Sequence, residues 1–173
     1  TTEIYTLSLH DALPIYSADL KIIKKLNNNS LVSGFTTNPT LMRLAGAKDY
    51  KNYSLKLLSV CKKKPISLEV FGDTTDQMLK QAIIINSWGK NVYVKIPVVN
   101  SKGFCSGKVI KILSKKNIKL NITAVYTANQ VRKIIKCINK DSKIIVSIFS
   151  GRMSDVGKDR KSTRLNSSHV KRS

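Results

Sequence analysis

Short apolar runs that are rich in β-branched residues recur along the chain at a regular distance. They lie at residues 31–36, 66–70, 92–96, 118–125 and 144–149. Each run is followed by a longer segment whose apolar residues recur with the spacing of a helix. Continuous apolar runs are typical of strands that are buried on both faces. Their starts lie about 25–35 residues apart, so the pattern predicts parallel strands joined by helical crossovers.

Three of the intervening helices can be delimited from signals at their ends. One begins at residues 73–75 (DTT), which are good N-cap residues, and ends near Gly89. A second runs from about Lys108 to Lys116, and Thr127 caps a third that carries Val131, Ile134, Ile135 and Ile138. No glycine-rich phosphate-binding loop follows any of the predicted strands. The α/β pattern therefore favours a (β/α) barrel over a doubly wound nucleotide-binding fold.

Polar residues stand where the predicted strands end, which is where the active site of a (β/α) barrel lies. They are Thr36, Thr37, Asn38, Glu69, Lys95, Asn121, Thr123, Ser147 and Arg152. A polar group buried without a partner costs roughly 2–7 kcal/mol. Their recurrence at every predicted strand therefore indicates a functional site.

Lys95 is the candidate with the most specific sequence context. It lies within residues 92–98 (VYVKIPV), with apolar neighbours on both sides and a proline that marks the end of the strand. Burial lowers the pKa of a lysine, because it disfavours the charged form. A neutral amine is the nucleophile that forms a Schiff base with a carbonyl substrate. The alternative is a lysine on an edge strand whose ammonium group reaches solvent.

The other strand-end residues each allow a functional and a structural interpretation. Glu69 could carry a proton directly or through water, or it could form an ion pair with Lys95. Asn38 and Asn121 could bind substrate hydroxyls, although Asn38 precedes a proline and also fits a turn or a helix cap. Arg152 could clamp a phosphate, or it could be an exposed loop residue.

Basic residues are in large excess: the 173 residues include 31 Lys+Arg and 10 Asp+Glu, for a net charge of +21. A nucleic-acid surface would explain this excess, and so would drift in an AT-rich genome, whose codons favour Lys, Asn and Ile together. Arginine is scarce, and no stripe of alternating basic and aromatic residues suggests base stacking. The composition therefore favours drift.

Histidine and cysteine usage excludes several kinds of site. The two histidines, His10 and His169, lie near the ends of the chain, which excludes a Ser-His-Asp triad or a histidine base in its body. Three scattered cysteines are too few for a disulfide framework or a four-cysteine metal site, so the cytoplasm is the expected compartment. No run approaches the roughly 18 apolar residues that a membrane span needs.

The two ends of the chain differ from its body. Residues 1–15 contain no Lys or Arg, and residues 159–173 contain no aromatic residue and no apolar periodicity. Residues 5–15 (YTLSLHDALPI) and 159–169 (DRKSTRLNSSH) resemble translations of a pair of sequencing adapters. We therefore expect residues 1–15 and 159–173 to be non-native and residues 16–158 to form a partial (β/α) barrel. The alternative is a pair of natural tails.

Five segments in the body carry a family resemblance. They are residues 34–41 (GFTTNPTL), 66–70 (ISLEV), 94–97 (VKIP), 120–125 (LNITAV) and 147–152 (SIFSGR). In this order and spacing they resemble the transaldolase family, in particular its small bacterial members, which include the fructose-6-phosphate aldolases. The resemblance implies an α/β fold of the (β/α)8 TIM-barrel type, with about strands one to six present. It also implies a class I aldolase mechanism that uses no metal and no organic cofactor.

The resemblance assigns roles to the candidate residues. Lys95 would form the Schiff base, while Glu69 and Thr123 would hold the catalytic water. The expected substrate-binding residues are Thr36, Asn38, Asn121, Ser147, Phe149 and Arg152. The implied reaction transfers a dihydroxyacetone unit from a ketose phosphate to an aldose phosphate, in the cytoplasmic pentose phosphate pathway. Sugar phosphates are thus the expected partners, in preference to nucleic acid or membrane, and the full-length parent is expected to form a homo-oligomer.

Individual positions refine this expectation and depart from it. Glu69 and Phe149 resemble true transaldolases, whereas the fructose-6-phosphate aldolases typically have Gln and Tyr there. We therefore expect transfer, with aldol cleavage as the alternative.

Tyr16 stands where the family has an Asp that shuttles a proton, and an adapter base in that codon would explain the change. Because two strands are missing, we expect the printed chain to be unstable and inactive. The alternative interpretations from other functional classes are a basic nucleic-acid-binding protein and a degraded remnant.

Overall fold

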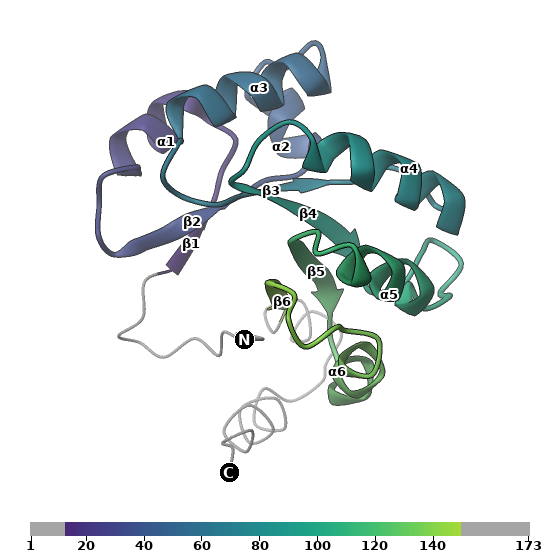
Figure 1. Ribbon diagram of the computed structural model, residues 1–173. Helices are drawn as coiled ribbons and strands as arrows, with labels where there is room; N and C mark the ends of the chain where they lie inside the picture. The colour runs from purple at the N-terminus through teal and green to yellow at the C-terminus, as the bar shows by residue number, and fades with distance from the viewer. Residues whose placement is uncertain (1–12, 150–173) are drawn as a thin grey trace, which may run out of the picture. The chain divides into compact units, whose positions relative to one another are not determined.

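The computed structural model describes residues 13–149, which divide into two compact units (Figure 1). The N-terminal unit ends at Lys95. It contains β1 (Leu13–Tyr16), α1 (Leu20–Leu26), β2 (Val32–Thr36), α2 (Pro39–Leu44), α3 (Tyr50–Val60), β3 (Ile66–Glu69), α4 (Thr75–Asn86) and most of β4 (Val92–Pro97). The C-terminal unit begins at Ile96 and contains α5 (Gly107–Lys115), β5 (Leu120–Val125), α6 (Ala128–Ile135) and β6 (Ile144–Ile148).

The strands of the N-terminal unit form a parallel sheet in the order of the chain, from β1 to β4. Tyr16 lies opposite Thr36, which lies opposite Ser67 on the next strand. Glu69 lies opposite Lys95 at the carboxyl ends of β3 and β4. Parallel pairing brings these strand ends to one edge of the sheet, which is where the sequence predicted the polar residues.

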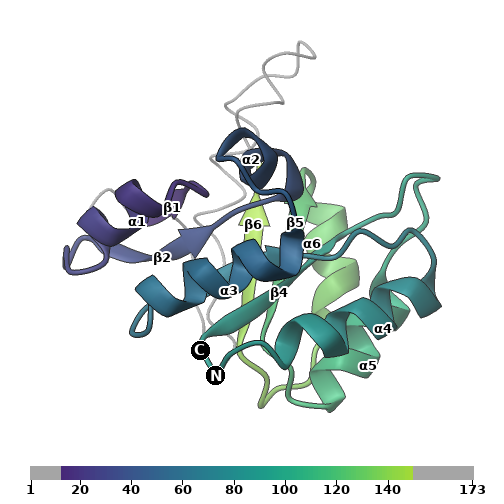
Figure 2. The ribbon, with the colours of Figure 1, turned by 90° about the horizontal axis from the view of Figure 1, so that it is seen from above.

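Helices α1, α3 and α4 lie on one face of this sheet (Figures 1 and 2). At the start of each helix, one side chain accepts hydrogen bonds from free amides of the first turn. The accepting residue is Asp19 for α1, Asp49 for α3 and Thr74 for α4. The core between helices and sheet is aliphatic and aromatic, and its fully buried members include Ile23, Phe35, Leu57, Ile66, Leu68, Val92 and Val94. Burial of each such side chain contributes about 1.5–3 kcal/mol and holds the sheet edge in place.

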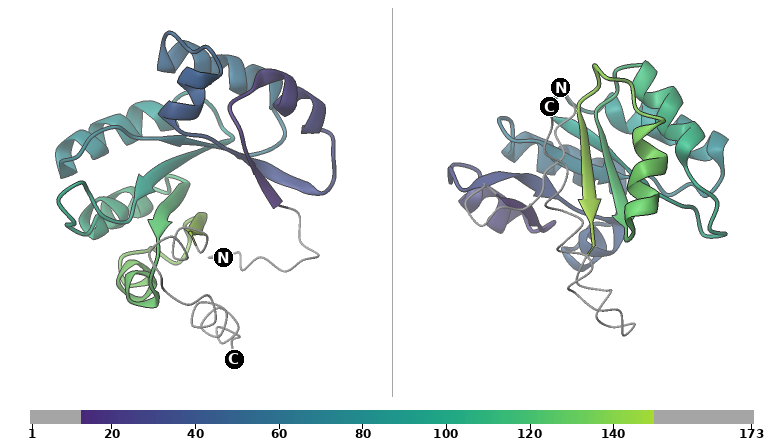
Figure 3. Two further views of the ribbon diagram at one scale, coloured as in Figure 1. Left: turned by 180° about the vertical axis from the view of Figure 1, so that it is seen from behind. Right: turned by 90° about the horizontal axis from the view of Figure 1, so that it is seen from below.

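In the C-terminal unit, β5 and β6 pair in parallel, and α5 and α6 lie along the pair (Figure 3). Thr127 caps α6 with a reciprocal capping box to Gln130. The register of β5 shifts between Ile122 and Val125, and Ala124 within this bulge has a φ of 58°. Left-handed backbone costs an alanine of the order of 1 kcal/mol. A bulge re-aims the side chains beside it, and the residue before Ala124 is the candidate Thr123.

The expected elements are confirmed with small changes at their ends. The predicted strand at residues 118–125 starts two residues later, because Asn117 adopts a left-handed φ of 55° and turns the chain. The predicted helix through Ile138 ends at Ile135 instead. There the amides of Cys137 and Ile138 donate hydrogen bonds to the carbonyls three residues earlier, which tightens the last turn and ends the helix. No helix within residues 13–149 has the length and apolar character to cross a membrane.

Candidate active site

Lys95 is buried at the carboxyl end of β4, with 3% of its surface exposed. Its Nζ lies 3.5 Å from Oε2 of Glu69 and donates a hydrogen bond of 3.3 Å to the carbonyl of Thr37. The neighbouring strand β3 places Glu69 directly opposite Lys95, and Thr37 directly follows β2, which is the next strand beyond β3. The interpretation of Lys95 as an exposed edge-strand lysine is therefore wrong.

Burial dominates the electrostatics of this pair. Desolvation lowers the pKa of Lys95 below its ordinary value of 10.5, and the attraction of Glu69 opposes that shift only in part. Desolvation likewise raises the pKa of Glu69 above 4.5, and Lys95 opposes it. Both shifts favour the neutral form, which for Lys95 is the nucleophilic form and for Glu69 is a form that can donate a proton.

Tyr16 and Asn38 complete the cluster in this unit. The ring of Tyr16 lies 5.4 Å from the Nζ of Lys95, within the range of a cation–π contact. Asn38 donates through Nδ2 to the hydroxyl of Tyr16, while its Oδ1 accepts a hydrogen bond of 2.7 Å from the amide of Leu41. Asn38 thus caps α2, as its alternative interpretation required, and it also faces the cluster. We call Tyr16, Asn38, Glu69 and Lys95 the Lys95 cluster.

Thr36 and Thr37 take different places beside the Lys95 cluster. Thr36 is half-buried at the end of β2, opposite Tyr16. Thr37 is buried and contributes its main-chain carbonyl to the Lys95 amine. A carbonyl contact of this kind depends on where the backbone turns, so no residue pattern in the sequence predicts it.

A second group of polar residues lies in the C-terminal unit. The Ser147 hydroxyl on β6 donates a hydrogen bond of 2.7 Å to Oδ1 of Asn121, which is buried on β5. Thr123 is 2% exposed, and its Oγ1 has no hydrogen-bond partner among the described residues. A buried hydroxyl without a partner costs roughly 1–3 kcal/mol. Its position two residues after Asn121 makes it a candidate to bind a water or a ligand hydroxyl.

Phe149 follows β6, and its ring lies 6.0 Å from that of Tyr126. Its amide donates a hydrogen bond of 2.9 Å to the carbonyl of Val125, which extends the pairing of β5 and β6 by one residue. Phe149 is therefore held at the carboxyl ends of β5 and β6, just beyond Ser147. Asn121, which was expected at a strand end, is instead the second residue of β5, because that strand starts at Leu120. Arg152, the remaining predicted site residue, lies outside the described residues.

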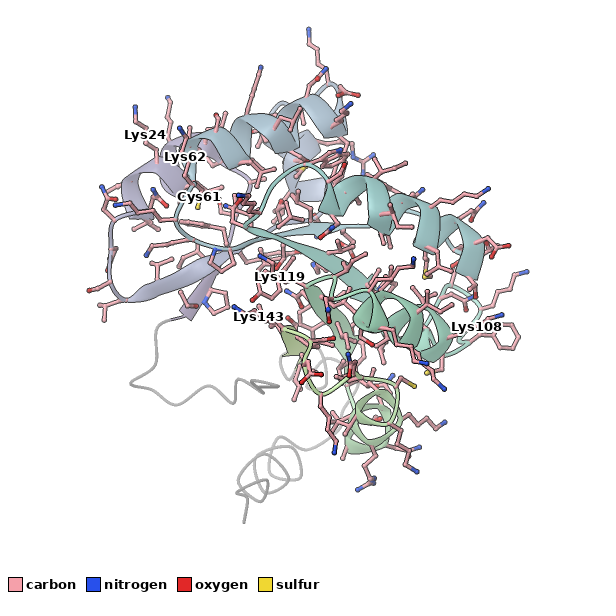
Figure 4. All side chains as sticks on the ribbon, in the orientation of Figure 1. Lys24, Cys61, Lys62, Lys108, Lys119 and Lys143 are labelled. Atoms are coloured by element: carbon pink, nitrogen blue, oxygen red, sulfur yellow. The ribbon has the colours of Figure 1, made fainter. Side chains whose placement is uncertain are left out.

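A lowered lysine pKa by itself does not identify the nucleophile, because Lys119 shares it. Partial burial and the charge of Lys143 lower the pKa of Lys119. Figure 4 shows these two side chains near one another, and Lys24, Lys62 and Lys108 directed outward into solvent. Lys119 directly precedes β5 and so lies at the amino end of that strand, two residues before Asn121, whereas Lys95 lies toward the carboxyl end of β4. Lys95 alone among these lysines combines a buried amine, a carboxylate and a strand end.

Among residues 13–149, no three His, Cys, Asp or Glu side chains form a group that could hold a metal ion. The Lys95 cluster brings together an amine, a carboxyl group, a phenol and a side-chain amide. This set of groups can attack a carbonyl carbon and move protons on the product.

A sequence model described as "Transaldolase/Fructose-6-phosphate aldolase" matches residues 15–172. The chain belongs to this family. It is 35% identical over 143 residues to a "Probable transaldolase" of Streptococcus agalactiae serotype V (strain ATCC BAA-611 / 2603 V/R), which covers 83% of this chain and 62% of that protein. It is 36% identical over 143 residues to a "Probable transaldolase" of Streptococcus pyogenes serotype M5 (strain Manfredo), with the same coverage. The chain thus spans 62% of the length of these curated relatives.

Family membership agrees with the alternation of parallel strands and helices in the described residues. The chain is an incomplete (β/α) barrel, as expected from its sequence. Its residues 13–149 supply β1 to β6. In a barrel of this family, the carboxyl ends of the strands are the place for catalytic chemistry.

Sequence reasoning missed one residue that the structure ties directly to this site. Tyr50 contacts both main-chain groups of Glu69 through its hydroxyl. It stands at the start of α3, after the capping residue Asp49, where an aromatic residue carries no recognisable signal. Only the folded chain brings it to Glu69, nineteen positions away.

Proposed function

We propose that this protein, at the length of its curated relatives, acts as a transaldolase, with Lys95 as the residue that forms a Schiff base with a ketose phosphate, and that the printed chain, which spans 62% of that length, is itself inactive. The observation that carries the proposal is the Lys95 amine, which is buried, lowered in pKa and held 3.5 Å from the Glu69 carboxylate. The proposed substrates are fructose 6-phosphate or sedoheptulose 7-phosphate as donor and an aldose phosphate as acceptor. The reaction would belong to the non-oxidative pentose phosphate pathway, in the cytoplasm.

The proposed reaction begins at the keto carbon of the donor. The neutral Lys95 amine adds to that carbon, and loss of one water gives an iminium ion. Glu69 is proposed to supply the proton that the departing water needs, directly or through a bound water that Thr123 also holds. The raised pKa of Glu69 supports this role, because it increases the fraction of the carboxyl that carries a proton to donate.

Cleavage then breaks the bond between carbons 3 and 4 of the donor. Its electron pair passes into the iminium to give an enamine, and the hydroxyl on carbon 4 loses its proton as the aldose phosphate leaves. The enamine next attacks the aldehyde of the acceptor, and hydrolysis returns the amine. We propose that Thr36, Asn38 and Asn121 bind the hydroxyls of the dihydroxyacetone unit. Ser147, Phe149 and Arg152 are proposed to line the side that takes the rest of the donor.

Tyr16 is poorly suited to accept the proton that is released during cleavage. A phenol hydroxyl carries a proton of its own and is therefore a poor acceptor for the hydroxyl proton. A carboxylate at this position would accept it. We therefore propose that Asp at position 16, rather than Tyr16, gives the full rate of cleavage.

The test is the stoichiometry of aldehyde release. Because we expect the printed chain to be inactive, the test uses a version extended to the length of its curated relatives, with Tyr or Asp at position 16. Each of these two proteins is mixed with fructose 6-phosphate, and glyceraldehyde 3-phosphate is measured with a coupled dehydrogenase. A transaldolase releases at most one equivalent of glyceraldehyde 3-phosphate per chain, and this release resumes when erythrose 4-phosphate is added. Lys95→Met should abolish release, and Lys90→Met, which changes an exposed lysine five residues earlier, should not. Release that survives in Lys95→Met, or none in either protein, overturns the proposal.

The same assay decides between transfer and simple cleavage. Continuous release without an acceptor, together with free dihydroxyacetone, would identify a fructose-6-phosphate aldolase instead. Glu69 and Phe149 favour transfer, because they are the residues typical of transaldolases at these positions.

A further inference from the structure

The main chain of Glu69 extends beyond the strand that should pair with it. In a strand, the amide and carbonyl of one residue point to the same neighbour, and those of the next residue point to the other. The carbonyl of Ser67 accepts a hydrogen bond of 3.2 Å from Thr37, so the groups of Ser67 face β2. Glu69, two residues later, faces the same way. However, β2 ends at Thr36 and Asn38 already caps α2.

Tyr50 fills the place of the missing strand. The amide of Glu69 donates a hydrogen bond of 2.8 Å to the Tyr50 hydroxyl, and that hydroxyl donates one of 2.9 Å to the carbonyl of Glu69. One side chain therefore satisfies both main-chain groups of a residue at the candidate site. A buried amide or carbonyl left unpaired would cost roughly 1–3 kcal/mol.

The Tyr50 ring is itself held in place. It packs edge-on against Phe71, with ring centroids 4.5 Å apart, and lies 5.9 Å from the ring of Trp88. Burial raises the pKa of Tyr50 far above its ordinary value, so its hydroxyl keeps the proton that it donates. Both ends of the contact are thus fixed, one by packing and the other by pairing between β3 and β4.

We propose that Tyr50 is a positioning residue that fixes the backbone of Glu69 and thereby holds its carboxylate beside the Lys95 amine. The inference rests on the proposed function, because it assigns Tyr50 a part in the same site. Tyr50 does not touch the reacting atoms. Without its hydroxyl, the end of β3 would have no partner on the β2 side, and the carboxylate would spend less time 3.5 Å from Lys95.

Tyr53 offers a matched control in the same helix. Its hydroxyl lies within hydrogen-bond distance of the carbonyls of Ala18 (2.9 Å) and Ala45 (3.2 Å) instead of the main chain of Glu69. Tyr50→Phe and Tyr53→Phe each remove one phenol oxygen from α3. Both should lower the urea concentration at half-unfolding. Only Tyr50→Phe should change the environment of Lys95.

The experiment measures the pH profile of Lys95 acetylation in the full chain. Each protein is treated with a trace of acetic anhydride across a pH series, and labelling of Lys95 is compared with that of Lys90 by peptide mass spectrometry. Glu69 from β3 and Tyr16 from β1 face the amine, and Glu69 holds the Lys95 pKa up. Tyr50→Phe should therefore shift the Lys95 midpoint to lower pH and raise its labelling below that midpoint by about threefold, or half a pH unit.

A Lys95 midpoint that is equal in Tyr50→Phe and Tyr53→Phe overturns the proposal. In a Glu69→Gln background, Tyr50→Phe should cause no further shift, and an undiminished shift would equally overturn it. If Tyr50→Phe does not fold, Phe71→Leu loosens the same ring and should give a smaller shift of the same sign. Labelling needs no substrate, so the result stands apart from the proposed function, which fails independently if Lys95→Met still releases glyceraldehyde 3-phosphate.

Discussion

Replacing Glu69 by glutamine removes the charge that opposes deprotonation of Lys95 while keeping the size of the side chain. At 3.5 Å, two unit charges in a medium of effective dielectric about 20 attract each other by about 5 kcal/mol. The Glu69 side chain is 21% exposed, so water screens it, and we take about 2 kcal/mol as the effective value. Loss of this attraction lowers the pKa of Lys95 and gives about thirtyfold more neutral amine at a fixed pH below the midpoint.

The assay is competitive acetylation across pH, with Lys90 as the internal reference. Glu69→Gln should move the Lys95 midpoint to lower pH, although the same change removes the proton carrier and should slow the release of glyceraldehyde 3-phosphate by the extended version. Nucleophile availability and turnover should thus move in opposite directions. An unchanged or higher midpoint for Lys95 would refute the reasoning, because Glu69 would then not govern the charge of the amine.

Three further changes test other parts of the account. In the unfolded chain Lys95 keeps a proton that it gives up in the folded chain, so the free energy of unfolding should rise with pH between the lowered pKa and 10.5. Urea denaturation at pH 7 and 9.5 should show a smaller rise for Lys95→Met, and an equal rise in both proteins would contradict the assignment. In the extended version, Tyr16→Asp should speed the release of glyceraldehyde 3-phosphate by about 100-fold, the usual value of a general base, whereas Tyr16→Phe should give no gain. Thr123→Val removes a buried hydroxyl without a partner, so it should raise the free energy of unfolding by about 1 kcal/mol; a loss of stability would show that the hydroxyl is satisfied.

Local chemistry explains which parts of the fold the sequence predicts. The apolar runs give the strands within about two residues, and the capping residues Thr74 and Thr127 mark the starts of α4 and α6. These signals depend on neighbours in the chain, so they can be read without the structure. The end of α6 at Ile135 could not be, because its final turn tightens through contacts that leave no residue signature.

The candidate site divides in the same way. Lys95 and Glu69 stand out because charged residues interrupt apolar strands, and their opposition follows from parallel pairing. The dual contacts of Asn38, to Leu41 and Tyr16, and the pairing of Asn121 with Ser147 depend on side-chain directions that only the folded units define. Tyr50 could not be predicted as a site residue at all, because it bonds to Glu69 at a point of the sheet where β2 has already ended.

Covalent trapping on Lys95 tests the central claim most directly. A version extended to the length of its curated relatives, with Asp at position 16, is incubated with fructose 6-phosphate, reduced with borohydride and digested with trypsin. An adduct on Lys95 blocks cleavage after that residue, so peptide 91–102 should carry the added mass of a reduced dihydroxyacetone or hexose phosphate unit. The account predicts this peptide only when both sugar and borohydride are present, with Lys90 unmodified. Sugar-dependent adducts spread over exposed lysines, with Lys95 free, would contradict it.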